Sequence, residues 1–143
     1  MDKIKHTDIN TSKNEVLSGM LYLVGTPIGN LSDITSRALK VLSEVDFIAA
    51  EDTRNSGKML SIFNISKPMV SYFEHNKRER GIQIINRIKS GESCALITDA
   101  GMPAISDPGE DIVKLCAEEN VPVTIIPGPS AVVSALALSG LTT

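Results

Sequence analysis

Short apolar runs alternate with longer stretches that are apolar on one side only along this chain of 143 residues. Five of the runs are nearly continuous and four to six residues long, which is typical of strands buried on both faces of a sheet. The expected strands are residues 20–24, 47–50, 69–73, 94–98 and 121–126.

Between the runs, apolar residues return with the 3.6-residue spacing of an amphipathic helix. The first such stretch places Ala38, Val41 and Leu42 on one face. Each stretch is preceded by residues that favour a helix start, such as a capping side chain, a proline or an acidic residue in the first turn. In chain order these signals are Ser32 or Asp33, Thr53, Asn76 with Glu79, Asp107 with Pro108 and Glu110, and residues 127–130.

The alternation of strand and helix predicts the fold class. We expect an α/β fold with a five-stranded, mostly parallel sheet that carries helices on both faces. The length fits one domain, which we assign to residues 20–143. Residues 1–19 are polar and precede the pattern, so we expect them to form a flexible N-terminal extension.

Composition excludes several classes of protein. The apolar stretch at residues 131–138 is too short to cross a bilayer, and the first 15 residues lack the apolar core of a secretion signal. Cys94 and Cys116 lie in apolar runs without a Cys or His neighbour at metal-ligand spacing. We therefore expect buried thiols, no metal site and a cytoplasmic location.

Charge is distributed unevenly along the chain. The formal net charge is −3, yet residues 54–89 carry eight basic and only two acidic side chains. A basic sector of this kind can guide a phosphate backbone to one face, but helix surfaces also carry such charges simply to stay solvated. Charge alone leaves both interpretations open. Two Tyr, three Phe and no Trp disfavour a base-stacking platform for single-stranded nucleic acid.

Glycine, proline and small polar residues gather where the expected strands end. Ligands of open α/β sheets bind beyond the carboxyl ends of the strands. The loops at these ends are residues 25–30, 51–54, 99–109 and 127–131. The first loop lacks the third glycine of a dinucleotide fingerprint, and Asp107 in the third favours a helix-capping role, so neither loop is diagnostic alone. Four such loops together predict a ligand site at one edge of the sheet.

Longer motifs across these loops resemble a known family. Residues 23–35, 50–54, 97–109 and 126–131 are similar to the ribosomal RNA small subunit methyltransferase I family of the tetrapyrrole methylase superfamily. The resemblance implies S-adenosylmethionine (SAM) as methyl donor and the ribose 2′-hydroxyl of a cytidine in the decoding region of 16S rRNA, in the small ribosomal subunit, as acceptor. It also implies two α/β domains with SAM in the cleft between them, this chain being the N-terminal half, and a homodimer. One departure is Met102, which stands where relatives often have Thr.

The resemblance also suggests roles for individual residues. The residues expected to bind SAM, mostly through main-chain groups, are Pro27, Asp99, Gly101, Met102, Pro103, Ala104, Ile105, Gly128, Pro129, Ser130 and Ala131. A ribose hydroxyl needs a base or a hydrogen-bond acceptor, for which Glu51, Asp52 and Asp99 are candidates, and His75 is either a further candidate or a surface residue. The residues expected to contact RNA are Arg54, Lys77, Arg78 and Arg80.

Two alternatives belong to other classes. The first is a methyltransferase that acts on a tetrapyrrole, which the loops at residues 25–30 and 51–54 disfavour. The second is a non-catalytic binding fragment, because a single domain would supply only one wall of a cleft and ligand pockets normally bury most of their ligand. We expect the isolated chain to bind SAM weakly and to show no turnover.

Overall fold

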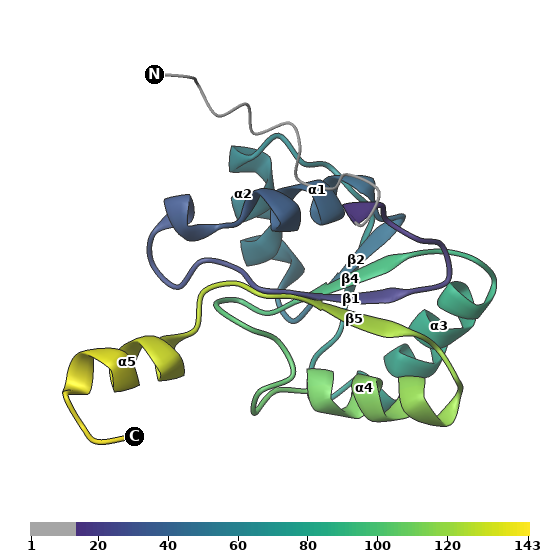
Figure 1. Ribbon diagram of the computed structural model, residues 1–143. Helices are drawn as coiled ribbons and strands as arrows, with labels where there is room; N and C mark the ends of the chain where they lie inside the picture. The colour runs from purple at the N-terminus through teal and green to yellow at the C-terminus, as the bar shows by residue number, and fades with distance from the viewer. Residues whose placement is uncertain (1–13) are drawn as a thin grey trace.

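A five-stranded sheet forms the centre of the computed structural model, which describes residues 14–143 (Figure 1). The strands are β1 (Leu21–Val24), β2 (Phe47–Ala50), β3 (Met69–Ser71), β4 (Cys94–Ile97) and β5 (Val123–Ile126). They pair in the order β3-β2-β4-β1-β5, and every pair is parallel. The predicted fold class is confirmed. The expected N-terminal extension lies largely outside the described residues.

Helices cover both faces of this sheet, as its apolar strands require. The helices are α1 (Ser36–Glu44), α2 (Thr53–Ile62), α3 (Lys77–Lys89), α4 (Gly109–Glu118) and α5 (Ala131–Ser139), and a 3-10 turn, η2, spans Leu31–Asp33. In Figure 1, α1 and α2 lie above the sheet and α3 and α4 lie below it. Because parallel crossovers are right-handed, the chain places helices on one face while it moves from β1 to β3, and on the other face after it reverses direction.

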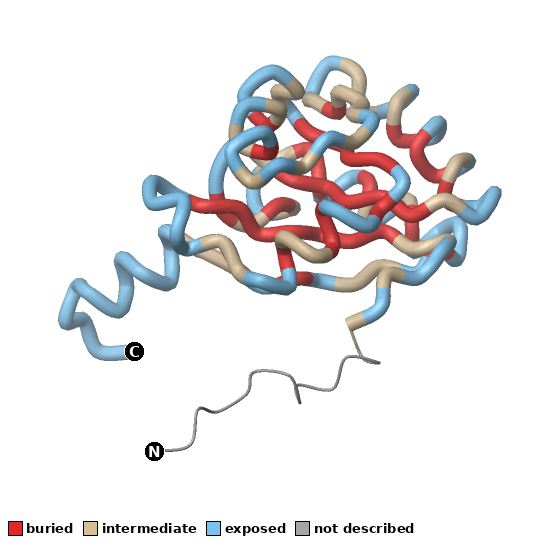
Figure 2. The backbone as a smooth tube through the Cα atoms, turned by 90° about the horizontal axis from the view of Figure 1, so that it is seen from above, coloured by how far each residue is buried: buried red, intermediate tan, exposed pale blue. Residues whose placement is uncertain are grey.

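Two apolar cores lie on either side of the sheet. Alternate residues of β1 point to opposite faces: Leu21 and Leu23 pack with α3 and α4, whereas Tyr22 and Val24 pack with α1 and α2. Cys94 and Cys116 both belong to the first core as buried, free thiols, and burial raises the pKa of Cys116 to about 11. The three central strands, β2, β4 and β1, are therefore buried from both sides, whereas the edge strands β3 and β5 are only partly buried. Figure 2 shows the buried residues gathered at the centre of the molecule.

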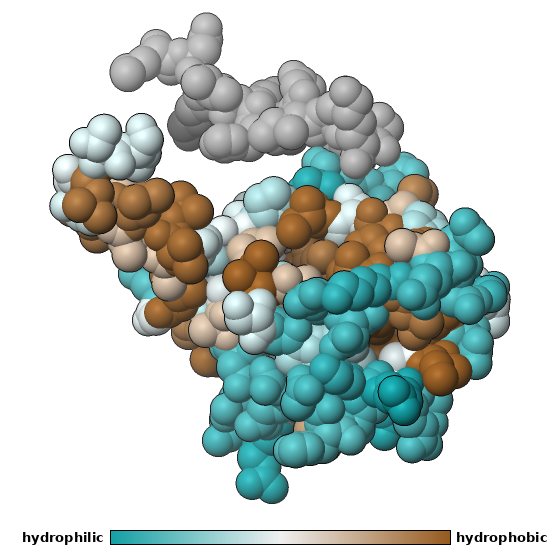
Figure 3. Space-filling model, turned by 90° about the horizontal axis from the view of Figure 1, so that it is seen from below, coloured by the Kyte–Doolittle hydropathy of each residue, from teal (hydrophilic) through white to brown (hydrophobic). Residues whose placement is uncertain are grey.

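The fifth helix departs from this scheme. It forms after the loop at residues 127–130, as expected, but none of its residues is buried and it covers neither face of the sheet. Figure 1 shows α5 standing away from the other elements, and Figure 3 shows its hydrophobic side chains gathered on that arm. Leu138, for example, is 89 % exposed. A helix that is apolar on all sides is normally buried, so α5 carries a large unpartnered surface.

The starts of α1 and α2 differ from the predicted ones. Thr35, rather than Ser32 or Asp33, caps α1, and its hydroxyl accepts a hydrogen bond from the N–H of Ala38 at 3.0 Å. Asp52 caps α2 by accepting from the N–H groups of Arg54 and Asn55, so Thr53 is the first residue of the helix instead of its cap. Neighbouring polar residues competed for each role, and the fold decided which of them lay beside the unpaired N–H groups.

Candidate functional site

The site predicted from the loops lies where the chain reverses direction across the sheet. β1 and β4 are neighbours, but the chain leaves β1 toward α1 on one face and leaves β4 toward α4 on the other. The two loops therefore leave the sheet toward opposite faces, beyond the carboxyl ends of these strands, which is the usual ligand position in open parallel sheets.

Backbone hydrogen bonds join the loops after β1 and β4 at this point. The N–H of Thr26 donates to the carbonyl of Gly101 at 3.0 Å, and the N–H of Gly101 donates back to the carbonyl of Thr26 at 3.1 Å. Thr26 is fully buried, and its hydroxyl lies 3.4 Å from the carbonyl oxygens of both Thr98 and Gly101. Thr26 thus locks the first and third loops together, a function that sequence reasoning did not assign to it.

The loop after β5 reaches the same place through glycine. A Cβ on Gly25 would lie 2.8 Å from the Cα of Gly128 and 2.6 Å from the sulfur of Met102. A Cβ on Gly101, which has φ +81°, would lie 3.5 Å from the carbonyl oxygen of Pro129. The loops that follow β1, β4 and β5 are therefore in direct contact, and the glycines permit this contact because they lack side chains.

The residues expected to bind SAM all belong to these three loops or to the first residue of α5. Within this set, Pro27, Gly101 and Pro103 are buried and support the loops, whereas Asp99 and Ile105 are exposed at the rim. The remaining members are half-buried, apart from Ala131, which is exposed. The arrangement offers backbone carbonyl and N–H groups together with one exposed carboxylate, a donor set that suits the ammonium, sulfonium and carboxylate of SAM.

Asp107 holds the third loop in shape. Its Oδ1 accepts from the N–H of Gly109 at 2.8 Å, at the start of α4, and from the N–H of Ala104 at 3.0 Å. The predicted capping contact is present, although α4 begins at Gly109 and Pro108 occupies the N-cap position. The second hydrogen bond extends the role of Asp107 from the helix into the loop.

The candidate bases differ in their surroundings. Glu51 follows β2 at the same edge of the sheet and lies with Asp107 around a hollow of about 430 Å³. Partial burial raises the pKa of Glu51 above its usual range, and the negative charges of Asp99, Asp107 and Asp52 raise it further. A carboxyl group with a raised pKa is a better proton acceptor, so Glu51 is the strongest of the three candidates.

The other two candidates occupy different positions in the fold. The Asp52 carboxylate is the cap of α2, and Asp99, exposed like Glu51, lies at the root of the third loop. His75 is exposed, and its ring packs edge-on to Phe73 with 6.3 Å between the ring centres. The structure therefore groups Glu51 and Asp99 near the loops and gives His75 an aromatic packing contact.

Ion pairs distinguish Lys77 from the other three predicted RNA-binding residues. The Lys77 ammonium lies 2.6 Å from Asp111 and 2.8 Å from Glu74. Within residues 14–143, by contrast, no carboxylate lies within ion-pairing distance of Arg54, Arg78 or Arg80, although Arg80 donates to the Gln83 side chain. Arg87 and Lys89, from the same basic segment, pair with Glu92 and Glu119. Part of the charge of this segment is thus neutralised locally.

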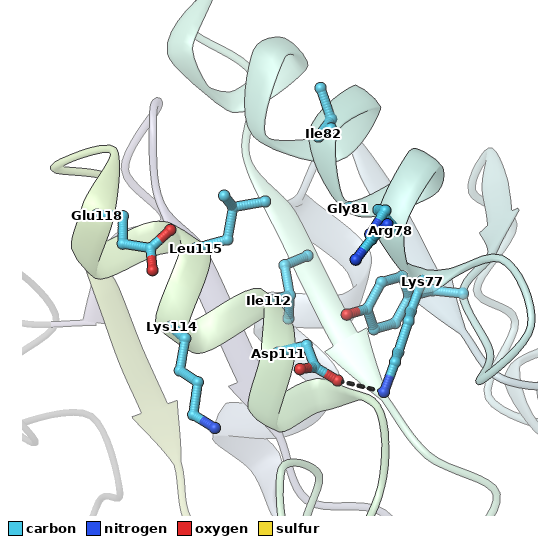
Figure 4. Close-up of a pocket in the computed structure, with 10 residues that line it drawn as sticks. Lys77, Arg78, Gly81, Ile82, Asp111, Ile112, Lys114, Leu115 and Glu118 are labelled. Atoms are coloured by element: carbon cyan, nitrogen blue, oxygen red, sulfur yellow. Dashed lines mark ion pairs between the residues drawn. The ribbon is translucent and has the colours of Figure 1, made fainter.

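A second hollow, of about 340 Å³, lies between α3 and α4, on the face of the sheet away from α1 (Figure 4). The Lys77–Asp111 ion pair bridges the two helices at one end of it, and Gly81, Ile112 and Leu115 line its interior. None of the three contacting loops lines this hollow, but it adjoins the hollow beside Glu51, because Lys77 and Asp111 line both.

In residues 14–143, no group of three or more His, Cys, Asp and Glu side chains is placed to hold a metal ion. None of the described helices combines the length and the apolar character needed to cross a membrane.

Comparison with known proteins gives a consistent picture. Residues 20–143 match the family described as tetrapyrrole (corrin/porphyrin) methylases. The chain is 50 % identical over 125 residues to the ribosomal RNA small subunit methyltransferase I of Synechocystis sp.. It is 52 % identical over 122 residues to the protein of the same name from Thermotoga maritima. These matches cover 87 % and 85 % of this chain but 45 % and 55 % of the relatives, so the chain spans about half their length.

Solved structures with the same fold are more distant in sequence. Uroporphyrin-III-C-methyltransferase from Thermus thermophilus superposes with a TM-score of 0.66 at 22 % identity, and diphthine synthase with a TM-score of 0.68 at 23 % identity. The superpositions cover 87 % and 86 % of this chain, and 53 % and 49 % of the two larger chains. At these identities the likeness establishes the architecture alone.

Proposed function

Because this chain belongs to the tetrapyrrole methylase family, we propose that it forms the N-terminal half of a SAM-dependent methyltransferase acting on small-subunit rRNA. The proposed acceptor is the ribose 2′-hydroxyl of a cytidine in the decoding region of 16S rRNA. The observation that carries the proposal is the contact among the three loops that follow β1, β4 and β5. The names of the relatives at about 50 % identity support RNA, rather than a tetrapyrrole, as the acceptor.

The loops suit the donor because they are rich in main-chain groups. Gly101 and Gly128 lack the side chains that would push the loops apart, and Asp99 adds an exposed carboxylate. SAM supplies an activated methyl group on a sulfonium. The residues of this chain bind and orient the donor so that the acceptor oxygen lies in line behind the methyl carbon.

The transfer forms one bond and breaks another. The ribose oxygen bonds to the methyl carbon while the carbon–sulfur bond breaks, and its electron pair stays on sulfur. The hydroxyl proton must leave, and Glu51 is the residue we propose to accept it, because its raised pKa favours proton uptake. Asp99 is the alternative acceptor at the same edge of the sheet.

The proposed RNA contact is concentrated on Arg54 and Arg78, whose guanidinium groups have no carboxylate partner among the described residues. Arg54 lies at the start of α2, three residues after Glu51, so a phosphate bound by Arg54 would lie near the proposed base. Lys77 contributes less, because it is paired with two carboxylates, and Arg80 keeps its charge while its guanidinium donates to the Gln83 side chain.

We further propose that a second domain covers α5. The helix directly follows the loop after β5, is apolar on all sides and is wholly exposed. The relatives are about twice as long as this chain. In this scheme residues 20–143 form one α/β domain and residues 1–19 form an extension. A C-terminal domain faces the three contacting loops, so that the two domains together enclose SAM. The complete enzyme is proposed to be a cytoplasmic homodimer, which light scattering of the purified protein would measure.

A methyl-transfer assay tests the function. The polypeptide comprising this chain and the proposed C-terminal half is incubated with methyl-labelled SAM and either small ribosomal subunits or a porphyrinoid. We expect label in 16S rRNA, on a cytidine whose 3′ phosphodiester resists alkaline cleavage because its 2′-hydroxyl is blocked. Label in the porphyrinoid alone would support the tetrapyrrole alternative. The same assay and a SAM titration on residues 1–143 alone are expected to show no turnover and weak binding.

A further inference from the structure

Tyr72 connects the core of the domain to the loop after β4. It follows β3 and is 2 % exposed, and its hydroxyl donates a hydrogen bond of 2.7 Å to the carbonyl of Pro108. Pro108 is itself buried, at the end of the loop of residues 99–109. The hydrogen bond therefore fixes the end of this loop from beneath, across 36 positions of sequence.

The loop needs such support because its backbone is strained. Ala104 and Ser106 have φ values of +65° and +59°, in the left-handed region that side chains with a Cβ rarely adopt. Asp107 holds this conformation through its hydrogen bonds to the N–H groups of Ala104 and Gly109. A Cβ on Gly109 would lie 2.9 Å from the nitrogen of Ala104, so the end of the loop packs directly against its middle.

These contacts connect the core to the backbone of residues 101–105. Tyr72 holds Pro108, the adjacent Asp107 holds Ala104, and Ala104 belongs to the segment at residues 101–105 that is expected to face the methyl donor. At the other end of the segment, Gly101 is held by its paired hydrogen bonds with Thr26. The donor-facing backbone is thus fixed at both ends.

We propose that Tyr72 is a positioning residue for the methyl donor, whose buried hydroxyl keeps residues 101–105 in their binding conformation by anchoring Pro108. The inference rests on the proposed function, since it assumes that this segment binds SAM. Tyr72 does not touch the donor; it acts through Pro108 and Asp107.

The surroundings of Tyr72 keep its hydroxyl a donor. Burial raises the pKa of the Tyr72 phenol well above its usual range, and the negative charge of Asp111 adds to the effect while the Lys77 ammonium opposes it. The phenol consequently remains protonated at every pH at which the protein would work. The anchor is therefore a constant feature of the loop, independent of pH.

Tyr72→Phe tests the proposal, because it removes one oxygen and keeps the buried ring. The matched control is Tyr22→Phe: Tyr22 is 4 % exposed on β1, and its hydroxyl accepts a 2.7 Å hydrogen bond from the N–H of Leu17, away from the loop. Each variant thus loses one hydrogen bond of 2.7 Å, which is buried at Tyr72 and partly buried at Tyr22. Both are made in the polypeptide that carries the proposed C-terminal half, and SAM affinity is measured by calorimetry, with KM and kcat from the rRNA assay.

We expect Tyr72→Phe to raise the Kd and KM for SAM about three- to tenfold, while kcat at saturating SAM and the KM for rRNA change less than twofold. Tyr22→Phe should lower Tm by a similar amount but leave the SAM constants unchanged. As a second test, Asp107→Ala should weaken SAM binding and Asp107→Asn should restore it, because asparagine retains an oxygen where Oδ1 accepts both hydrogen bonds.

The outcomes separate this inference from the function on which it rests. Wild-type protein that neither binds SAM nor methylates rRNA would overturn the proposed function and the inference with it. Wild-type protein that binds SAM, combined with equal SAM constants for Tyr72→Phe and Tyr22→Phe, would overturn the inference alone. If Tyr72→Phe does not fold, equal SAM affinity for Asp107→Ala and Asp107→Asn has the same consequence.

Discussion

Gly25→Ala tests the contact between the loops that follow β1 and β5. The added Cβ would lie 2.6 Å from the sulfur of Met102 and 2.8 and 2.9 Å from the Cα and nitrogen of Gly128. The Met102 side chain can move aside, but Gly128 is backbone and also sets the position of the loop after β5. The methyl group can be accommodated only if the loops after β1 and β5 move apart.

The expected cost follows from these distances. Overpacking by one methyl group in a rigid environment costs roughly 1–3 kcal/mol, and two backbone contacts below 3.0 Å place this case at the upper end, about 2–3 kcal/mol. For a domain of this size, each kcal/mol lowers Tm by roughly 3–4 °C, so we expect a fall of about 6–12 °C. SAM affinity should fall by about tenfold or more, because the displaced loops form the proposed donor site.

Thermal unfolding followed by circular dichroism measures the first effect, and calorimetric titration with SAM measures the second. Gly57→Ala is the matched control, because Gly57 lies inside α2 and its added Cβ would approach only the sulfur of Met69, at 4.0 Å. This control should leave SAM binding unchanged and stabilise the helix by roughly 0.5–1 kcal/mol. A Gly25→Ala protein with wild-type Tm and SAM affinity would show that the loops are not in contact as described.

Three further predictions concern charged side chains. The Asp46 carboxylate accepts from the N–H and hydroxyl of Ser93, which lowers its pKa below the ordinary 3.8. Its stabilising effect is present above 3.8 and is lost as pH falls through the lowered pKa. Asp46→Asn should therefore lower Tm at pH 7, and the difference in Tm between the variant and the wild type should shrink as the pH is lowered below 3.8. Glu51→Gln should reduce kcat by roughly 10²–10⁴-fold, because it removes the proposed base. The acidic limb of the wild-type pH–rate profile should lie above 4.5, the ordinary pKa of a glutamate. A reduction of kcat by less than tenfold would assign the base to another residue. Arg54→Ala should weaken rRNA binding more than SAM binding, and it should reduce the slope of log K for rRNA binding against log salt concentration by about one. Lys77→Ala should change this slope less, because the Lys77 ammonium is already paired with two carboxylates. Filter binding at several salt concentrations measures both slopes, and equal slopes for the two variants would contradict the prediction.

Local sequence pattern was sufficient to predict the architecture. Continuous apolar runs such as residues 47–50 and 94–98 indicated strands covered on both faces, and helices between them implied a parallel sheet. In a parallel sheet all strand ends of one kind share an edge, so the loops at residues 25–30, 51–54, 99–109 and 127–131 were expected to lie together. The structure places three of them in contact, and Glu51 of the fourth lies beside the same hollow as Asp107.

Local pattern was weaker where neighbouring residues competed for one role. Ser32, Asp33 and Thr35 can each cap a helix, and only the folded chain shows that Thr35 meets the free N–H of Ala38. The apolar stretch that became α5 likewise predicted a helix, but its spacing did not reveal that nothing within the described residues covers it. Propensity reports what a segment can form, whereas burial depends on what else is present.

The chain by itself therefore determined the strands, most of the helices and the edge of the sheet that carries the loops, because these depend on residues a few positions apart. Tertiary structure alone decided the features that join distant segments. Tyr72 meets Pro108, and Gly25 meets Gly128, across many intervening residues, and Lys77 is neutralised partly by Asp111 from another helix. No short-range pattern encodes such contacts, because they arise from strand order and helix packing and form only when the whole domain has folded.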